Sequence, residues 1–251
     1  MYDKNEYQLN YQNLTFEDKL RKYRMKYLVD YFATIPSNKI LEIGCGNDPI
    51  FLSYNDFDVM DIVEPGIHFY EFTKNKIGTD SRITIQNCLI ESSELLLKNE
   101  YDVIIIGGFL HEIDNPDVVL ATVKKLASPN TFIITYVPNA DSFHRILALE
   151  SGIIESNYEL SKNDLLFGRS IVYNFESIKS LFVTSGFTVT ELDTYFIKLF
   201  THEQMDAIIR LPFMNKDILD GLFKMCKYIP DMGCEIFVSA KTTGYQQSVI
   251  H

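Results

Sequence analysis

The sequence predicts an α/β protein built on a mostly parallel β-sheet, and three observations support this fold class. Short apolar runs of strand length alternate with helical stretches from residue 39 onward. Several of these runs are apolar throughout, which is typical of strands covered by helices on both faces. A glycine-containing loop directly follows the first run, at the sheet edge where ligands bind in such folds. Helices are therefore expected on both faces of the sheet.

Composition limits the class of protein and its partners. The 251 residues, 46 % of them hydrophobic, suffice for one large α/β domain with a modest cap. Acidic residues outnumber basic ones by 34 to 23, a net charge of −11 that repels nucleic-acid phosphates. No apolar run approaches the roughly 18 residues of a membrane span, and the N-terminus lacks a signal-peptide layout. We expect a cytoplasmic monomer or homodimer that binds neither nucleic acid nor membrane.

The four cysteines include no C-x-x-C pair. This spacing argues against a zinc knuckle and against a redox dithiol, so no metal site is expected. Reduced cysteines are the simplest interpretation for a cytoplasmic protein.

The predicted elements follow one another regularly as far as Pro138. Strands are expected at 39–44, 57–66, 82–87, 101–107 and 131–138. Apolar residues recur at helical spacing over 15–34, 67–78 and 116–127, which predicts helices there. The first helix carries a basic run that is expected to form its solvated face: Lys19, Arg21, Lys22, Arg24 and Lys26.

The regular alternation breaks after Pro138. A helix at 175–187, a strand at 187–193 and a last strand at 234–240 still fit the α/β pattern. The stretches 139–173 and 195–230 are too long for simple loops and are expected to form a cap over the ligand cleft. The domain division that follows is an N-terminal helical lid segment at 1–36 and a main domain at 37–251 that carries both insertions.

The most informative motif is the run from Glu42 to Gly46, directly after the first strand. Gly44 and Gly46 permit a tight turn that brings backbone N–H groups close to a ligand. Glu64 ends the second strand, where a carboxylate accepts both hydroxyls of a ribose. The combination predicts a nucleoside cofactor. Pro49 stands where the dinucleotide pattern has its third glycine, which weakens a nicotinamide or flavin assignment, and no P-loop motif is present.

Four segments together resemble the class I S-adenosylmethionine-dependent methyltransferases of the small-molecule acceptor type. They are LEIGCG, IVEPG, Asn87-Cys88 and GGFLHEIDNP, within residues 38–140. The resemblance implies a Rossmann-like seven-stranded sheet whose last strand is antiparallel, with S-adenosyl-L-methionine as cofactor. The helix after the glycine loop departs from the family, since little room precedes the second strand.

The resemblance also implies the cofactor-binding residues, position by position. The first strand and its loop would surround the methionyl part, the second strand would hold the ribose, the third would flank the adenine, and the fourth would lie near the sulfonium. These residues are Glu42, Gly44, Cys45, Gly46, Glu64, Pro65, Asn87, Cys88, Leu89, Gly107 and Gly108. The family more often has Asp where this chain has Asn87.

Methyl transfer from a sulfonium is an in-line displacement, so catalysis is mainly orientation and control of the nucleophile's charge. A hydroxyl acceptor benefits from a nearby base, and His111 after the fourth strand is the catalytic candidate. A histidine packed at a helix start is the equally weighted alternative. Candidate acceptor-binding residues, each with a structural alternative, are Tyr11, His144, Arg145, Arg169, Tyr173, Lys198 and His202.

The leading hypothesis is therefore an enzyme that methylates a small polar acceptor. The layout of the insertions is similar to bacterial methyltransferases acting on nucleotide-linked or phosphate-bearing precursors of surface polysaccharide, and an oxygen is the preferred target. N-methylation of an amino sugar or another small amine is the alternative reaction. A non-catalytic cofactor-binding module and an oxidoreductase on a similar sheet are the alternatives from other classes.

Overall fold

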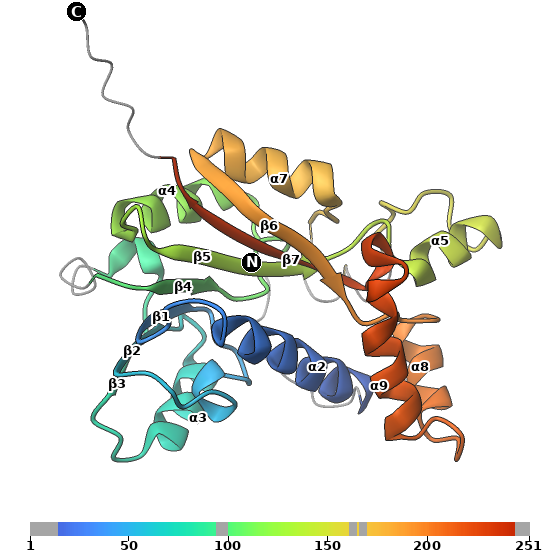
Figure 1. Ribbon diagram of the computed structural model, residues 1–251, viewed down its shortest axis with the longest axis horizontal. Coiled ribbons are helices and arrows are strands. Elements are labelled where there is room, and N and C mark those ends of the chain that lie inside the picture. Colours follow the sequence, from blue (N-terminus) through green and yellow to red (C-terminus); the bar gives the residue numbers. More distant parts are fainter. Residues whose placement is uncertain (1–14, 94–99, 161–164, 166–169, 244–251) are drawn as a thin grey trace, which may run out of the picture.

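The computed structural model describes residues 15–93, 100–160, 165 and 170–243. Within them, seven strands form one sheet in the order β3-β2-β1-β4-β5-β7-β6 (Figure 1). The strands are β1 (Lys39–Ile43), β2 (Val59–Val63), β3 (Ile83–Gln86), β4 (Val103–Ile106), β5 (Phe132–Pro138), β6 (Phe187–Tyr195) and β7 (Glu235–Thr242). The neighbours from β3 to β5 pair in parallel, whereas β7 is antiparallel to both β5 and β6. The fold class and the antiparallel last strand are thus confirmed.

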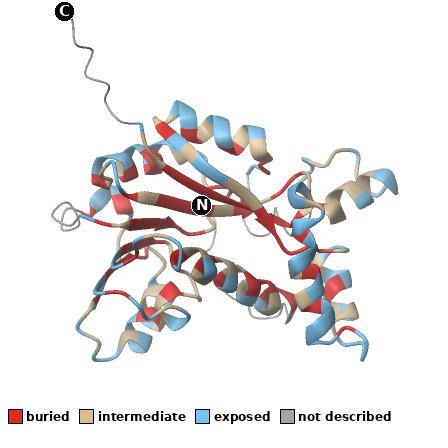
Figure 2. Cartoon of the chain, viewed as in Figure 1, coloured by how far each residue is buried: buried red, intermediate tan, exposed pale blue. Residues whose placement is uncertain are grey.

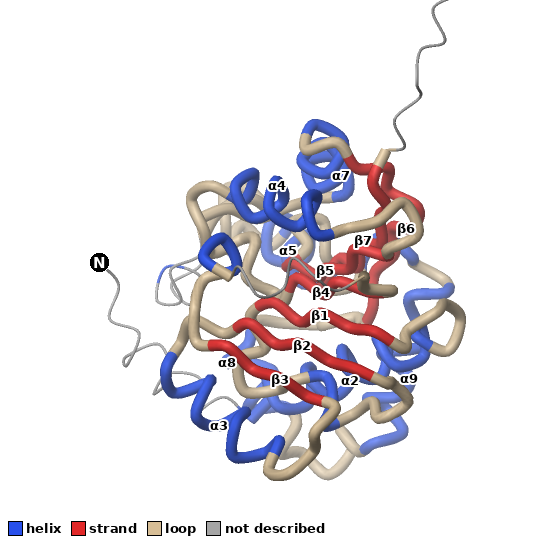
Figure 3. The backbone as a smooth tube through the Cα atoms, turned by 90° about the vertical axis from the view of Figure 1, so that its left-hand side faces the viewer, coloured by secondary structure: helices blue, strands red, loops and turns tan. Residues whose placement is uncertain are grey.

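Helices cover both faces of the sheet (Figure 3). The α-helices are α2 (Thr15–Phe32), α3 (Ile67–Ile77), α4 (Pro116–Leu126), α5 (Phe143–Glu150), α7 (Phe175–Thr184), α8 (His202–Ile208) and α9 (Lys216–Lys224). Short 3-10 helices are η1 (Ile50–Leu52), η2 (Ile90–Ser92), η4 (Met225–Lys227) and η5 (Pro230–Met232). None of the described helices is both long and apolar enough to cross a membrane.

Side chains of successive strand residues point to opposite faces, which divides the core into two clusters. Ile40 and Val103 pack with residues of α2 and α9 on one face. Leu41 and Ile104 pack with residues of α4 and α7 on the other. The inner strands β1, β2, β4, β5 and β7 are accordingly buried along most of their length (Figure 2), whereas the edge strands β3 and β6 are only partly buried.

The segment after the glycine loop is short, as the sequence indicates. Its only helical turn among the described residues is η1, which begins after Pro49. The two insertions contain α5 in the first and α8 and α9 in the second. In Figure 1, α5, α8 and α9 lie together at the right of the molecule, beyond the ends of β5, β6 and β7 on that side.

The expectation that the basic run of α2 is a solvated face is wrong in part. Lys22 and Lys26 are exposed, but the side chain of Arg24 is only 12 % exposed and pairs with Glu235 of β7. Arg21 is also largely covered, with 19 % of its side chain exposed. The helix therefore uses two of its cations for tertiary contacts rather than for solvation.

Candidate active site

The glycine loop between β1 and η1 has a shape that requires its two glycines. Gly44 and Gly46 have positive φ angles of 73° and 56°, a region that residues with a side chain rarely adopt. The N–H of Gly44 donates to the carbonyl of Val63, 2.8 Å away. A Cβ on Gly44 would lie 2.8 Å from the ring of Phe109, so the β4 loop packs directly on this turn.

Glu64, at the end of β2, holds two loops at once. Its Oε2 accepts the N–H of Gly46 at 3.0 Å, and its Oε1 accepts the N–H of Gly66 at 2.7 Å. The side chain is buried. Pro65 lies between Glu64 and Gly66 and is half-buried.

Glu42 supports the same loop from inside the sheet. Both of its carboxylate oxygens lie 3.1–3.2 Å from the backbone nitrogen of Ile50, which donates to them at the start of η1. The pKa of Glu42 is raised to about 8, chiefly by burial and in part by the nearby charges of Glu64 and Asp48, while the hydrogen bond from Ile50 acts in the opposite direction. Cys45 is a buried thiol whose pKa burial also raises, which makes it a packing group rather than a nucleophile.

The residues after β3 lie next to Glu64. The side-chain amide of Asn87 donates to the backbone carbonyl of Glu64 at 2.8 Å, and it remains exposed. Cys88 is half-buried, and Leu89 is 56 % exposed. The structure thus brings the segments after β1, β2 and β3 to one edge of the sheet, which is the edge that the sequence predicts for a nucleoside ligand.

The loop after β4 packs tightly on the same edge. A Cβ on Gly107 would collide with the backbone oxygen of Gly44, and one on Gly108 would lie 2.5 Å from the ring of Tyr136. His111 is buried, and its Nε2 lies 3.6 Å from Oε1 of Glu112. The carbonyl of His111 accepts the N–H of Ser170, so this residue lies where the β4 loop meets the first insertion.

Three of the candidate acceptor residues come together from three different segments of the chain. Lys198 is buried, and its Nζ lies 2.9 Å from Nδ1 of His202. Burial lowers the pKa of His144 well below its usual value, and positive charge on Lys198 and Arg145 acts in the same direction. The structure therefore groups His144, Lys198 and His202, which come from α5, from the segment after β6 and from α8.

His202 also connects α8 to the N-terminal helix α2. Its Nε2 lies 2.8 Å from Oε2 of Glu17. Because a lysine ammonium only donates hydrogen bonds, Nδ1 must accept from Lys198 and Nε2–H must donate to Glu17. The arrangement therefore selects the neutral tautomer of His202 with its proton on Nε2.

A second cluster of charged and aromatic residues continues from Glu17, and sequence reasoning did not identify it. Arg24 donates to both carboxylate oxygens of Glu235, at 2.5 and 2.9 Å. Tyr195 donates to the same carboxylate. The Arg24 guanidinium lies 4.8 Å from the centre of the Tyr136 ring, which connects this cluster to Gly108. A basic helix and a strand tyrosine carry no sequence signal for such a partnership.

Two other candidate acceptor residues have structural roles. Arg145 donates from Nη1 to the backbone carbonyls of Asn157 and Glu159, which fixes the chain after α5. Tyr173 is buried and donates to the carbonyl of Leu110, and burial raises its pKa to about 12. Tyr11 and Arg169 lie outside the described residues.

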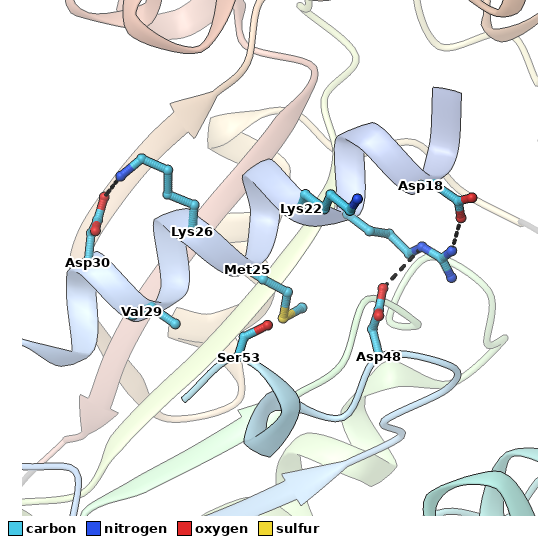
Figure 4. Close-up of a pocket in the computed structure, with 9 residues that line it drawn as sticks. Asp18, Lys22, Met25, Lys26, Val29, Asp30, Asp48 and Ser53 are labelled. Carbon is cyan, nitrogen blue, oxygen red and sulfur yellow. Dashed lines mark hydrogen bonds and ion pairs between the residues drawn. The ribbon is translucent and has the colours of Figure 1, made fainter. Parts of the chain in front are cut away.

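A pocket of about 530 Å³ lies between α2 and the outer part of the glycine loop (Figure 4). Met25 and Val29 of the helix form apolar parts of its wall, and Asp48 and Ser53 lie on the opposite side. Arg21 Nε lies 3.0 Å from Asp48 Oδ2 across this pocket.

The chain is similar to known methyltransferases. A family model described as a methyltransferase domain matches residues 17–192. No curated protein matches the chain.

Solved structures of methyltransferases share the fold. An S-adenosylmethionine-dependent methyltransferase from Leishmania major has a TM-score of 0.57 at 16 % identity, covering 89 % of this chain and 74 % of its own. One from Mesorhizobium loti has a TM-score of 0.55 at 13 % identity, covering 83 % and 94 %. The plantazolicin methyltransferase BamL, solved with a triazolic desmethylPZN analog and SAH, has a TM-score of 0.60 at 12 % identity, covering 96 % and 91 %.

Proposed function

Because the chain belongs to the methyltransferase-domain family and is an S-adenosylmethionine-dependent methyltransferase, we propose that it methylates an oxygen of a small anionic acceptor. The acceptor class is a phosphate-bearing or nucleotide-linked precursor of bacterial surface polysaccharide. The proposal includes the division into a lid segment at 1–36 and a methyltransferase domain at 37–251, with cap insertions at 139–173 and 195–230.

The residues at the edge of β1 to β4 fit the donor. Glu64 is a buried carboxylate at the end of β2, held by the N–H groups of Gly46 and Gly66, and a carboxylate at this position accepts the hydroxyls of a ribose. The turn is open at Gly46, where an added Cβ would meet no atom within 4 Å. We assign donor contacts to the residues of these four loops: Glu42, Gly44, Cys45, Gly46, Glu64, Pro65, Asn87, Cys88, Leu89, Gly107 and Gly108.

The observation that carries the acceptor proposal is the grouping of Lys198, His202 and His144. The Lys198 ammonium is buried, and burial strengthens its attraction for an anion. Glu17 offsets part of this positive charge through His202, and Arg145 contributes positive charge close enough to lower the pKa of His144. Burial is the main cause of the low pKa of His144, and nearby positive charge lowers it further; the same positive charge would attract a phosphate or carboxylate beside this imidazole.

The donor, when bound, supplies a methyl group already activated by its positive sulfur, so the chain's task is to orient the acceptor and receive its proton. His111 lies in the loop after β4, which begins with Gly107 and Gly108. We assign to it the role of the base that takes the proton from an acceptor hydroxyl. An amine acceptor would need no such base, so loss of activity on replacing His111 favours oxygen over nitrogen.

The test is methyl transfer from labelled donor to a matched panel of acceptors. The panel pairs a nucleotide-linked sugar with the same sugar lacking phosphate, and adds an amino sugar. We expect label on the phosphate-bearing member, at an oxygen. Equal transfer to the uncharged sugar would overturn the anionic acceptor, and label on nitrogen would overturn O-methylation. Donor binding without any transfer would favour a non-catalytic module.

Lys198→Met refines this test. Removing the buried cation is expected to raise the acceptor KM about tenfold while the donor KM stays unchanged, because one charge-assisted contact is lost. Lys179→Met, which removes an exposed lysine of α7, is the matched control. An unchanged acceptor KM in Lys198→Met would contradict the assignment of this cluster to the acceptor.

A further inference from the structure

Helix α2 is fixed to the antiparallel side of the sheet by polar contacts that span the chain. Arg24 pairs with Glu235 of β7. The hydroxyl of Tyr27 donates to Asp193 of β6 at 2.6 Å, and that of Tyr31 lies 2.9 Å from the hydroxyl oxygen of Ser239. These contacts, with the packing of buried residues such as Leu28 against the core, make α2 a firmly placed element.

From this fixed helix, one side chain reaches the glycine loop. Arg21 Nε lies 3.0 Å from Oδ2 of Asp48, and Arg21 also pairs with Asp18 one turn earlier. Figure 4 shows Asp48 on the loop facing α2 across the pocket between them. The side chains of Arg21 and Asp48 are 19 % and 37 % exposed, so water screens this pair only in part.

The contact falls on the part of the loop that the sheet holds least directly. The inner residues Gly44 and Gly46 donate to Val63 and Glu64 of the neighbouring strand segment. Asp48 donates its N–H only to Cys45 within the same loop, at 3.3 Å, among the backbone contacts described for it. Glu42 of β1 holds the end of the loop at Ile50, and between Gly46 and Ile50 the Asp48 carboxylate is contacted by Arg21 of α2.

We propose that Arg21 is a positioning residue for donor binding, which acts through Asp48 to hold the glycine loop in its binding shape. Arg21 is not assigned a contact with the donor. The inference concerns the donor side alone and does not depend on the identity of the acceptor. It also assigns α2 a specific task, because the helix transmits the placement of β6 and β7 to a loop on the other half of the sheet.

The test is a double-mutant cycle on the affinity for S-adenosylhomocysteine, measured by titration calorimetry with the full chain. Arg21→Met and Asp48→Asn are each expected to weaken binding about three- to fivefold, the range of a partly exposed ion pair. The double variant is expected to bind no more weakly than either single variant, because the two residues act as one unit. Arg21→Lys should restore most of the affinity.

Lys26→Met is the matched control. This change removes an ion pair with Asp30 on the same helix and at the same pocket, away from the glycine loop. The affinity of this variant for S-adenosylhomocysteine should therefore equal that of the unaltered protein. Thermal unfolding of each ligand-free variant shows whether the fold is intact.

Two results would overturn the inference. Unchanged affinity in both single variants would mean that the pair does not position the loop. Additive losses in the double variant would mean that Arg21 acts on the donor independently of Asp48. Absence of binding by the unaltered protein would instead contradict the assignment of the donor. Failure of the donor assignment is therefore distinguishable from failure of the inference about Arg21.

Discussion

The two halves of the sheet build their sites in different ways. At the edge of β1 to β4, which we call the donor half, backbone N–H groups and carboxylates meet within short stretches, as in the contact of Glu64 with Gly46. At β5 to β7 with α5, α8 and α9, which we call the acceptor half, charged side chains meet from distant segments. His202 and Glu17 lie 185 residues apart, and Arg24 and Glu235 lie 211 apart. The donor half is therefore specified by local motifs and the acceptor half by tertiary packing.

The largest expected effect tests the tight backbone packing of the donor half. In Gly107→Ala, the added Cβ would meet the backbone oxygens of Gly44 and Ile43, which are unable to move aside as a flexible side chain would. We expect the free energy of unfolding in urea to fall by about 3 kcal/mol or more.

Gly221→Ala is the matched control in the acceptor half. A Cβ there meets no atom within 4 Å inside α9, so the same change should stabilise the protein by up to about 1 kcal/mol. Comparable losses in the two variants would contradict the contrast between the halves.

The next effect concerns Glu64, which joins two loops of the donor half. Glu64→Ala removes the acceptor of two backbone N–H groups, each a charge-assisted hydrogen bond. We expect the affinity for labelled S-adenosylmethionine, measured by equilibrium dialysis, to fall about a hundredfold. Glu71→Ala, on the exposed face of α3, should leave it unchanged. A loss of less than about threefold would mean that the loops are held without this carboxylate.

The smallest effect is the pH dependence of stability that Glu42 introduces. Its pKa is raised from 4.5 to about 8 in the folded protein, chiefly by burial. A raised pKa favours the folded state fully below the unfolded value, and this contribution is lost as the pH rises through the folded value. The free energy of unfolding of the unaltered protein should therefore fall, relative to Glu42→Gln, by about 2 kcal/mol from about pH 5 to about pH 6.5.

Urea unfolding at several pH values checks this difference. Parallel curves for the two proteins would mean that Glu42 is already ionised in the fold, and that its contacts with Ile50 outweigh its burial.

The strands and the turn of the donor half can be predicted from the sequence. The contacts that form them join residues close together in the sequence or lie along a single strand. The apolar run at 39–44 predicts β1, which the structure places at Lys39–Ile43, and the glycines that follow it predict the turn. The limited room before the second strand correctly indicates the single turn of η1. Parallel strands buried on both faces leave a continuous apolar signal that needs no knowledge of tertiary partners.

The acceptor half is less predictable, because its charged residues look alike whether they face water or a distant partner. Arg24 and Lys22 belong to the same basic run of α2. Of these two, only Arg24 pairs with a carboxylate from β7. Arg145 has the type expected of an anion-binding residue, but its guanidinium donates to carbonyls at 157 and 159, and backbone oxygens leave no trace in sequence. Tyr136 reads as one more apolar strand residue, although it lies beneath Arg24.

The separation of donor from acceptor binding is tested most directly by titrating S-adenosylhomocysteine into three forms of the protein in a calorimeter. We predict one molecule bound per chain of the unaltered protein, unchanged affinity in Lys198→Met, and affinity reduced about a hundredfold in Glu64→Ala. A loss in Lys198→Met as large as that in Glu64→Ala, or no binding heat with the unaltered protein, would contradict the account.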